Sequence, residues 1–171
     1  MKLEFIEYIV ITLILSDFLV TLFGNIPFFR GESDINEGNP VVALFIKFGI
    51  IPLALLTVVW IFVVIFLFKK LKEPLNYVWI FMPIVGHLWG VSTWIVFTYK
   101  IPVLEIILLP YVVVIGYSAY FLGDLFSIPF FVSEILIFVI FGGLLGFIFN
   151  VFTKNWSIKI REKVRREKKR S

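Results

Sequence analysis

The chain of 171 residues contains no cysteine and no glutamine, and it has only two methionines and one histidine. The absence of cysteine excludes disulfides, thiolate metal sites and cysteine nucleophiles, but it leaves the redox compartment open. Few labile residues beside abundant Ile, Lys and Glu are typical of heat-adapted proteins. A single histidine among scattered carboxylates has no metal-ligand spacing, so we expect no metal site and no cofactor.

Charge is also scarce, because only 16% of the residues are charged whereas 60% are hydrophobic. The mean hydropathy is +1.01. Soluble domains have about 25% charged and about 45–50% apolar residues. A soluble core of this length could not bury so much apolar surface, whereas lipid solvates it directly. The composition therefore predicts an all-α integral membrane helical bundle.

Apolar runs long enough to cross a bilayer define a transmembrane domain over residues 1–153. The predicted spans are 5–29, 41–68, 75–99, 101–122 and 129–152. The first is interpreted as a retained helix, since no signal-peptide cleavage site follows it. The second run is longer than a bilayer requires, which predicts tilt or a kink at Gly49 and Pro52.

The distribution of Lys and Arg predicts the orientation of these spans. With five crossings, Arg30, Lys100 and the nine basic residues of 154–171 lie on one side, eleven in all, against four on the other. The positive-inside rule then places the N-terminus outside and the C-terminus in the cytoplasm of a cell membrane. The basic cluster at 69–72 disagrees, because it would itself prefer the cytoplasm. If that cluster dominates, a later segment is re-entrant or another crossing exists.

Asp17 lies in the middle of the first apolar run, where an aspartate costs about 2.5–3.5 kcal/mol on insertion scales. Thr21 is four residues away and shares its helix face. Most polar residues of the spans fall in the half nearest loop 30–40, which predicts a polar pocket opening there. The candidate polar site comprises Asp17, Thr21, Glu37, Asn39, His87 and Glu105, with Glu105 preferred to Glu134. Alternatively, Asp17 is protonated, or it pairs with Lys47 or His87, and it only holds helices together.

His87 is flanked by Gly86 and Gly90, a spacing that allows close helix approach. The histidine could carry protons, or it could be a hydrogen-bonded side chain between helices. Gly142 and Gly146 form a second close-packing pair. That pair could dimerise the protein, but in so small a bundle internal packing is favoured.

Residues 154–171 form a basic tail whose apolar residues recur every four positions. This pattern predicts an amphipathic helix held at the membrane surface by anionic lipid headgroups, with no need for nucleic acid. The membrane-surface residues are Trp156, Lys159, Arg161, Arg165 and Arg166. Other membrane subunits or a second copy are further possible partners.

Asp17-x-x-x-Thr21, followed by Glu37-x-Asn39-Pro40 before a second apolar helix, resembles a pattern in small prokaryotic multi-pass membrane proteins of unknown function. The resemblance covers roughly residues 8–70. It implies that the Asp, Thr, Glu and Asn-Pro residues act together, but it implies no activity. Asn39 and Pro40 are also suited to capping and starting a helix.

These observations favour translocation of protons, small ions or small solutes through the polar site around Asp17. One alternative is an accessory or assembly subunit of a membrane complex, and another is an intramembrane enzyme acting on lipid or peptide. The sequence lacks nucleotide-binding, hydrolase and metalloprotease motifs, which argues against an enzyme.

Overall fold

A computed structural model describes the backbone of residues 4–168 and the side chains of residues 4–155. The described residues form helices joined by short loops, and they contain no strand. Its elements are α1 (Phe5–Gly24), α2 (Ile26–Phe29), α3 (Pro40–Lys47), α4 (Ile50–Lys70), α5 (Leu75–Thr93), the π-helical turn η1 (Trp94–Tyr99), α6 (Pro102–Phe126) and α7 (Phe130–Lys168). Among the described residues, five helices are long and apolar enough to cross a membrane, as the sequence predicts.

Two of the predicted apolar runs are each divided into a long helix and a short one. The first run ends as α1 at Gly24, and the short helix α2 follows the buried Asn25. The second run breaks between α3 and α4 at Gly49, which has φ +104°, a left-handed conformation that favours glycine. The predicted kink at Gly49 is therefore confirmed. Pro52 lies in the first turn of α4, where its missing N–H costs no helical hydrogen bond.

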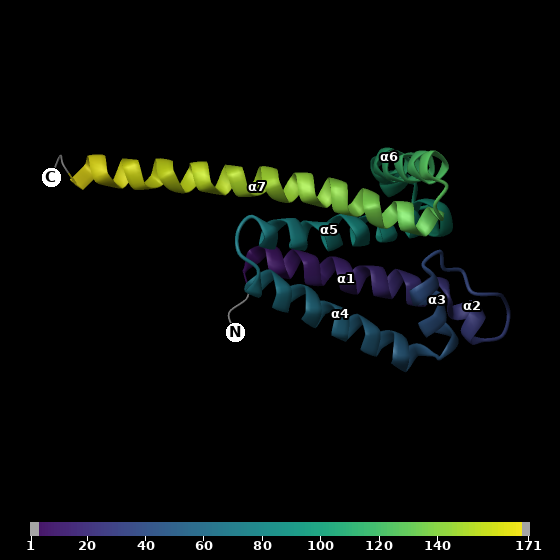
Figure 1. The fold of residues 1–171 in the computed structure, drawn as a ribbon. Helices are drawn as coiled ribbons and strands as arrows, with labels where there is room; N and C mark the ends of the chain where they lie inside the picture. The colour runs from purple at the N-terminus through teal and green to yellow at the C-terminus, as the bar shows by residue number, and fades with distance from the viewer. Residues whose placement is uncertain (1–3, 169–171) are drawn as a thin grey trace.

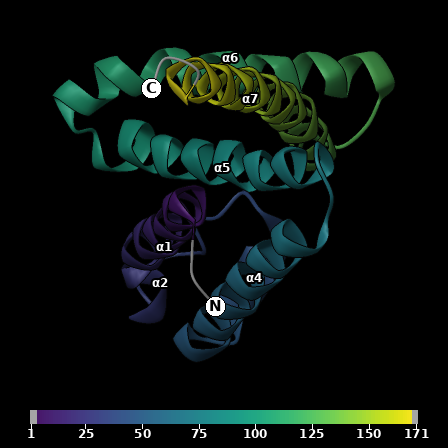
Figure 2. The same cartoon turned by 90° about the vertical axis from the view of Figure 1, so that its left-hand side faces the viewer.

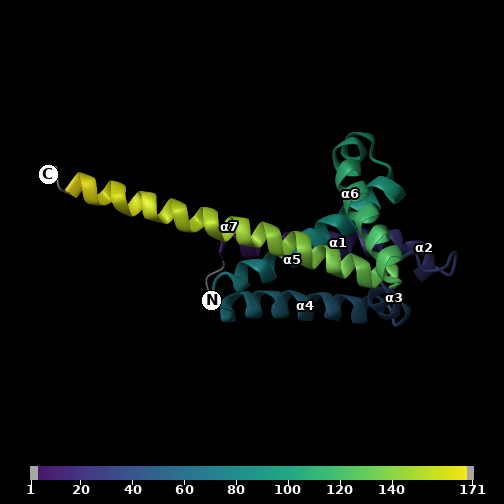
Figure 3. The ribbon, with the colours of Figure 1, turned by 45° about the horizontal axis from the view of Figure 1, so that its top comes forward.

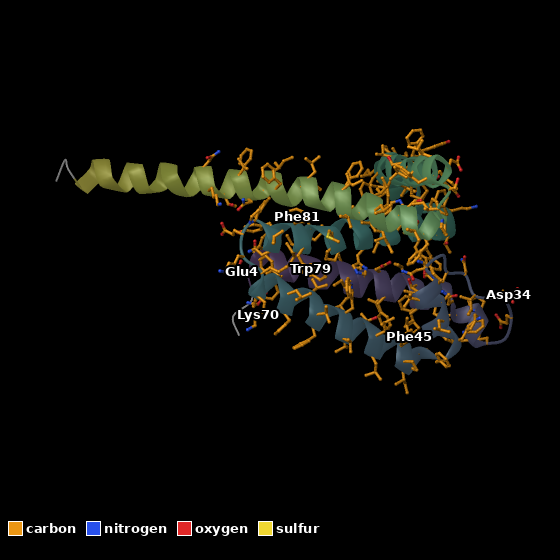
Figure 4. All side chains as sticks on the ribbon, viewed as in Figure 1. Glu4, Asp34, Phe45, Lys70, Trp79 and Phe81 are labelled. Carbon is orange, nitrogen blue, oxygen red and sulfur yellow. The ribbon has the colours of Figure 1, made fainter. Side chains whose placement is uncertain are left out.

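The long helices α1, α4 and α5 pack together and define two ends of the bundle (Figure 1). At one end, Lys69 Nζ lies 3.1 Å from Oε2 of the fully buried Glu7, and we call it the lysine end. The opposite end carries residues 30–39, and we call it the loop end. Figure 4 shows Glu4 and Lys70 at the lysine end and Asp34 at the loop end.

Glycines bring α5 and α7 into close antiparallel contact. A Cβ added to Gly142 would lie 2.6 Å from the backbone of Met82, and one added to Gly146 would lie 2.6 Å from the backbone of Tyr77. Near the lysine end, Lys154 Nζ lies 3.7 Å from Glu73 Oε2. In the structure this glycine pair packs against α5 of the same chain.

Helix α6 runs across the other long helices. In Figure 1, α6 is seen end-on, whereas α1, α4, α5 and α7 extend along the width of the picture. Figures 2 and 3 show the same relation, with α6 crossing α7 rather than running beside it. The crossing is packed by Val85 of α5, Ile115 and Ala119 of α6, and Ile137 of α7. The Tyr111 hydroxyl also donates to the Val85 carbonyl at 2.7 Å.

The last helix continues through the predicted boundary between the membrane domain and the tail. Helix α7 runs from Phe130 to Lys168 and extends beyond the rest of the bundle past the lysine end (Figures 1 and 3). The backbone of residues 154–168 is thus helical and continuous with the rest of α7. The predicted surface contacts of Trp156, Lys159, Arg161, Arg165 and Arg166 lie outside the side chains that the structure describes.

Candidate functional site

Three helices meet at a chain of hydrogen bonds centred on His87. Its Nδ1 lies 2.7 Å from Oδ2 of Asp17 on α1, and Trp60 of α4 donates from its indole Nε1 to His87 Nε2 at 2.9 Å. Because Nε2 accepts from Trp60, the proton of the neutral ring is on Nδ1, and that N–H donates to the Asp17 carboxylate. Of the two partners considered for Asp17, the structure selects His87, whereas Lys47 is exposed.

The contact between Asp17 and α5 depends on a glycine. A Cβ at Gly90 would lie 2.6 Å from Asp17 Oδ1, closer than real Cβ contacts allow. Gly86, one turn earlier, would place a Cβ 3.3 Å from the ring of Phe138 on α7. The predicted glycine pair therefore lets α5 pack closely on α1 at Gly90 and on α7 at Gly86. The close approach at Gly90 brings the Asp17 carboxylate to the His87 ring.

Asn25 attaches the loop after α2 to the end of α1. Its side-chain amide donates to the Thr21 carbonyl at 2.9 Å and to the Asn36 carbonyl at 3.2 Å, and its Oδ1 accepts from the Asn36 amide at 2.9 Å. The side chain of Asn25 is almost fully buried, so these bonds are shielded from competition. The loop is thereby folded back and holds Glu37 beside Thr21.

Glu37 is the ionisable group of the site that lies outside the predicted spans. Burial raises its pKa to about 7, and the negative charge of Asp17 acts in the same direction. The Asn39 amide, which donates to Glu37 Oε1 at 2.8 Å, opposes that shift. Glu37 can therefore exchange a proton near neutral pH and is electrostatically coupled to Asp17.

The polar groups of α1 lie along its buried stripe. Glu7, Thr21 and the following Asn25 are buried, and Asp17 is one turn before Thr21. Between Glu7 and Asp17 the stripe is apolar, because Val10 and Ile14 pack into a core cluster. The remaining buried members of that cluster are Val64, Ile65, Phe68 and Ile80. Polar side chains thus reach Asp17 from the loop end, and an apolar layer separates Asp17 from the lysine end.

Two predicted site residues have other roles or positions. Asn39 caps α3, accepting from the amides of Val41 and Val42 at 2.9 and 3.2 Å, as its position before Pro40 predicts. Glu105 is in the first turn of α6, and among the described residues no hydrogen bond or ion pair holds it. The sequence favours Glu105 over Glu134 as a site residue. In the structure, however, it is Glu134 of α7 that interacts electrostatically with Glu37.

Neither of two hollows on the described surface includes Asp17, where the sequence predicts a polar pocket. One hollow of about 350 Å³ lies between α6 and α7, beside Asp124 and Ser127. Another of about 450 Å³ is lined by apolar side chains of α5 and α7. The side chains of Asp17 and His87 are nevertheless 23% and 21% exposed, so the pair is not sealed.

Two residues of the site, Trp60 and Asn25, and the buried Glu7 at the lysine end were missed from the sequence. Trp60 lies in the middle of an apolar run, whereas membrane tryptophans favour the interface, and this displaced position is a usable signal. Glu7 lies ten residues before Asp17 on the same stripe, but it looks like an interfacial residue. Asn25 gives no signal, because its partner is the backbone of Asn36 in a loop.

Within the described residues, no group of three or more His, Cys, Asp or Glu side chains could hold a metal ion. Comparisons with protein-family models, with curated proteins and with solved structures find no match to this chain.

Proposed function

We propose that the protein translocates protons, alone or together with a small ion or solute, through the hydrogen-bonded pair of Asp17 and His87. The observation that carries this proposal is the chain from Asp17 through His87 to Trp60, which joins α1, α5 and α4 within the apolar part of the bundle. Ionisable residues inside membrane spans are costly, and they commonly mark ion pathways or proton relays. We place the protein in a cell membrane with its basic tail in the cytoplasm.

The chemistry of the pair supports a protonation switch. A carboxylate at Asp17 and a neutral ring at His87 fit the two hydrogen bonds of the ring. A proton arriving from water can bind to the Asp17 carboxylate, which neutralises its charge and leaves the bond from Trp60 intact. A proton arriving at His87 Nε2 instead would face the Trp60 N–H, and two donors cannot share one hydrogen bond. Protonation of the ring would therefore separate α4 from α5 at this point.

The surroundings of the pair support access from the loop end. Glu37 exchanges protons near neutral pH and lies within range of Asp17, with Thr21 between them on the helix face. Toward the lysine end, Val10 and Ile14 belong to the apolar cluster that excludes water. Transport across the whole membrane then requires this layer to open, and the loss of the Trp60 bond supplies a movement of α4 that would open it.

The geometry favours this function over an intramembrane hydrolase. A hydrolase would need a nucleophile beside the histidine, but both His87 nitrogens are already occupied. The nearest serine in sequence, Ser92, donates its hydroxyl to the Leu88 carbonyl at 2.6 Å.

Proton flux in proteoliposomes tests the proposal. Protein reconstituted with an internal pH dye should acidify vesicles under an imposed potential, and Asp17→Asn should lower the rate at least tenfold. Asp34→Asn is the matched control, because it makes the same change on an exposed loop residue and should retain full flux. Flux in Asp17→Asn equal to that of the unchanged protein removes Asp17 from the mechanism, and absence of flux in the unchanged protein refutes the function.

A further inference from the structure

We propose that α6 lies in the plane of the membrane, with its open apolar face covered by lipid acyl chains of one leaflet, so that the chain crosses the bilayer four times. This inference concerns topology and does not depend on the function proposed above. It rests on where the two ends of α6 lie, on its direction and on its exposed residues.

Both ends of α6 lie at the loop end of the bundle. Helix α5 starts near the lysine end and reaches Lys100 through η1. Helix α7 is antiparallel to α5, because Gly142 packs on Met82 and Gly146 packs on Tyr77. Helix α7 starts near the loop end, since the charge of Glu37 acts on Glu134. It then runs to the lysine end, where Lys154 contacts Glu73. A helix that crossed the bilayer would instead have its two ends on opposite sides.

The connections to α6 are too short to change this conclusion. Only Lys100 and Ile101 separate η1 from α6, and only residues 127–129 separate α6 from α7. Lys100 and Ser127 have φ values of 49° and 52°, so the backbone turns sharply at each junction. A helix of 25 residues is about 37 Å long at 1.5 Å per residue, and α6 places this length across α7 rather than along it (Figure 2).

The exposed face of α6 is suited to acyl chains. Its buried face is narrow and centres on Val112, Ile115 and Ala119. The rest of the helix exposes large apolar side chains, among them Val103 (69%), Ile106 (76%), Ile107 (65%), Tyr117 (73%) and Phe121 (67%). Pro110 has no N–H and so leaves the Ile106 carbonyl without its helical donor. The other backbone groups in the interior of α6 can bond within the helix, so α6 can lie in hydrocarbon. Lipid is the occupant that matches an apolar face on a helix held at the level of one leaflet.

With five crossings, the basic cluster at 69–72 lies outside although it would itself prefer the cytoplasm. Four crossings remove this conflict. By chain connectivity, four crossings put residue 2, the cluster 69–72 and the tail on the same side of the membrane as the lysine end, and these segments hold thirteen of the sixteen Lys and Arg residues. The loop end keeps Arg30, Lys47 and Lys100. The positive-inside rule accordingly places the lysine end, with both termini, in the cytoplasm. The N-terminus is thus on the side opposite to the one that five crossings predict.

Single-cysteine labelling decides the number of crossings, because the chain has no cysteine of its own. Ser33→Cys, Ser127→Cys and Lys72→Cys each place a thiol at an exposed position. In intact cells, we expect an impermeant maleimide to label positions 33 and 127 but to reach position 72 only after permeabilisation. Labelling of 33 and 127 from opposite sides overturns the proposal. Labelling of position 72 alone from outside overturns the assignment of the cytoplasmic side.

Spin-label depth profiles test the position of α6 within the leaflet. Nitroxides at exposed positions 103, 107, 114, 117 and 121 should show equal depth and high accessibility to oxygen dissolved in lipid. Positions 51, 55, 58, 62 and 66 of α4 are the matched control for a crossing helix, where depth should change by about 1.5 Å per residue. A similar gradient along α6 refutes the in-plane helix. Spin–spin broadening with low oxygen accessibility would show a second copy on this face and refute lipid as its occupant.

Discussion

Asp17 Oδ2 and His87 Nδ1 lie 2.7 Å apart, joining residues that are seventy positions apart in the chain. The bond is charge-assisted, because a neutral imidazole N–H donates to a carboxylate, and such bonds are shorter and stronger than neutral ones. It explains how the aspartate is tolerated inside an apolar run. It also accounts for the glycine opposite, since Gly90 leaves the room that the carboxylate occupies.

The first prediction concerns the tautomer of His87. Trp60 and the Asp17 carboxylate should together hold the ring as the Nδ1–H form. Trp60→Phe keeps an aromatic ring and removes the indole N–H, so it should weaken this preference and admit a fraction of the Nε2–H form. Because His87 is the single histidine, ¹⁵N-histidine labelling gives one unambiguous pair of ring signals. We expect the two nitrogen shifts of the unchanged protein to differ clearly and those of the variant to move toward each other.

Trp89→Phe is the control for the tautomer experiment. Trp89 is on the same helix as His87, but its indole N–H points to the Val112 carbonyl at 3.4 Å and does not contact the ring. Its removal should leave the histidine signals unchanged. Equal shifts in the unchanged protein and in Trp60→Phe would show that Trp60 does not fix the ring.

The second prediction concerns Gly90. Alanine is a better helix former than glycine by about 1 kcal/mol in an ordinary helix. At this site, however, the added Cβ would lie 2.6 Å from Asp17 Oδ1 and would displace the carboxylate from His87. We expect Gly90→Ala to lower the free energy of unfolding by about 1–3 kcal/mol, the usual cost of overpacking, and to reduce proton flux. Gly116→Ala in α6 meets no atom within 4 Å, so it should leave both quantities unchanged or raise stability slightly.

The sequence indicates several residues of this site, but it does not indicate the hydrogen bonds that join them. A charge at midspan and a lone histidine between glycines both stand out against apolar residues, so Asp17 and His87 could be found. The position of Trp60 away from the membrane interface is a signal, but it does not identify the partner of Trp60, because a tryptophan inside an apolar run is also a good core residue. Glu37 was placed near the site from the polarity of its loop, but the fold-back that Asn25 produces depends on backbone hydrogen bonds that no spacing encodes.

The direction of α6 shows a different limit of the sequence. Its apolar run has the length and hydropathy of a crossing helix, and composition alone does not distinguish a helix along the bilayer normal from one across it. The determining information is the packing of Gly142 on Met82 together with that of Gly146 on Tyr77, which makes α7 antiparallel to α5. The basic cluster at 69–72 was the one local signal for this arrangement.

The third prediction uses two neighbouring glycines of α7. A Cβ at Gly142 would lie 2.6 Å from backbone atoms of Met82, and backbone cannot rotate away as a side chain can. A Cβ at Gly143 would lie 3.8 Å from a Val78 methyl, which is ordinary contact. We expect Gly142→Ala to lower the unfolding free energy by about 1–3 kcal/mol and Gly143→Ala to have little effect. Thermal unfolding in one detergent compares them, and equal midpoints for the two variants would refute the close antiparallel packing.

The fourth prediction concerns the pH dependence contributed by Glu37. Its pKa is about 7 in the folded protein, above the ordinary value of 4.5, because burial and the charge of Asp17 disfavour the carboxylate. The contribution of neutral Glu37 to the free energy of unfolding is therefore fully present below pH 4.5, and it is lost as the pH rises toward 7. Glu37→Gln should match the unchanged protein at pH 4 and exceed its unfolding free energy at pH 8, by at most about 3 kcal/mol. Glu32→Gln, the same change on an exposed residue of the same loop, should track the unchanged protein at both pH values. A constant difference between Glu37→Gln and the unchanged protein from pH 4 to pH 8 would show that Glu37 is not held in the buried position described.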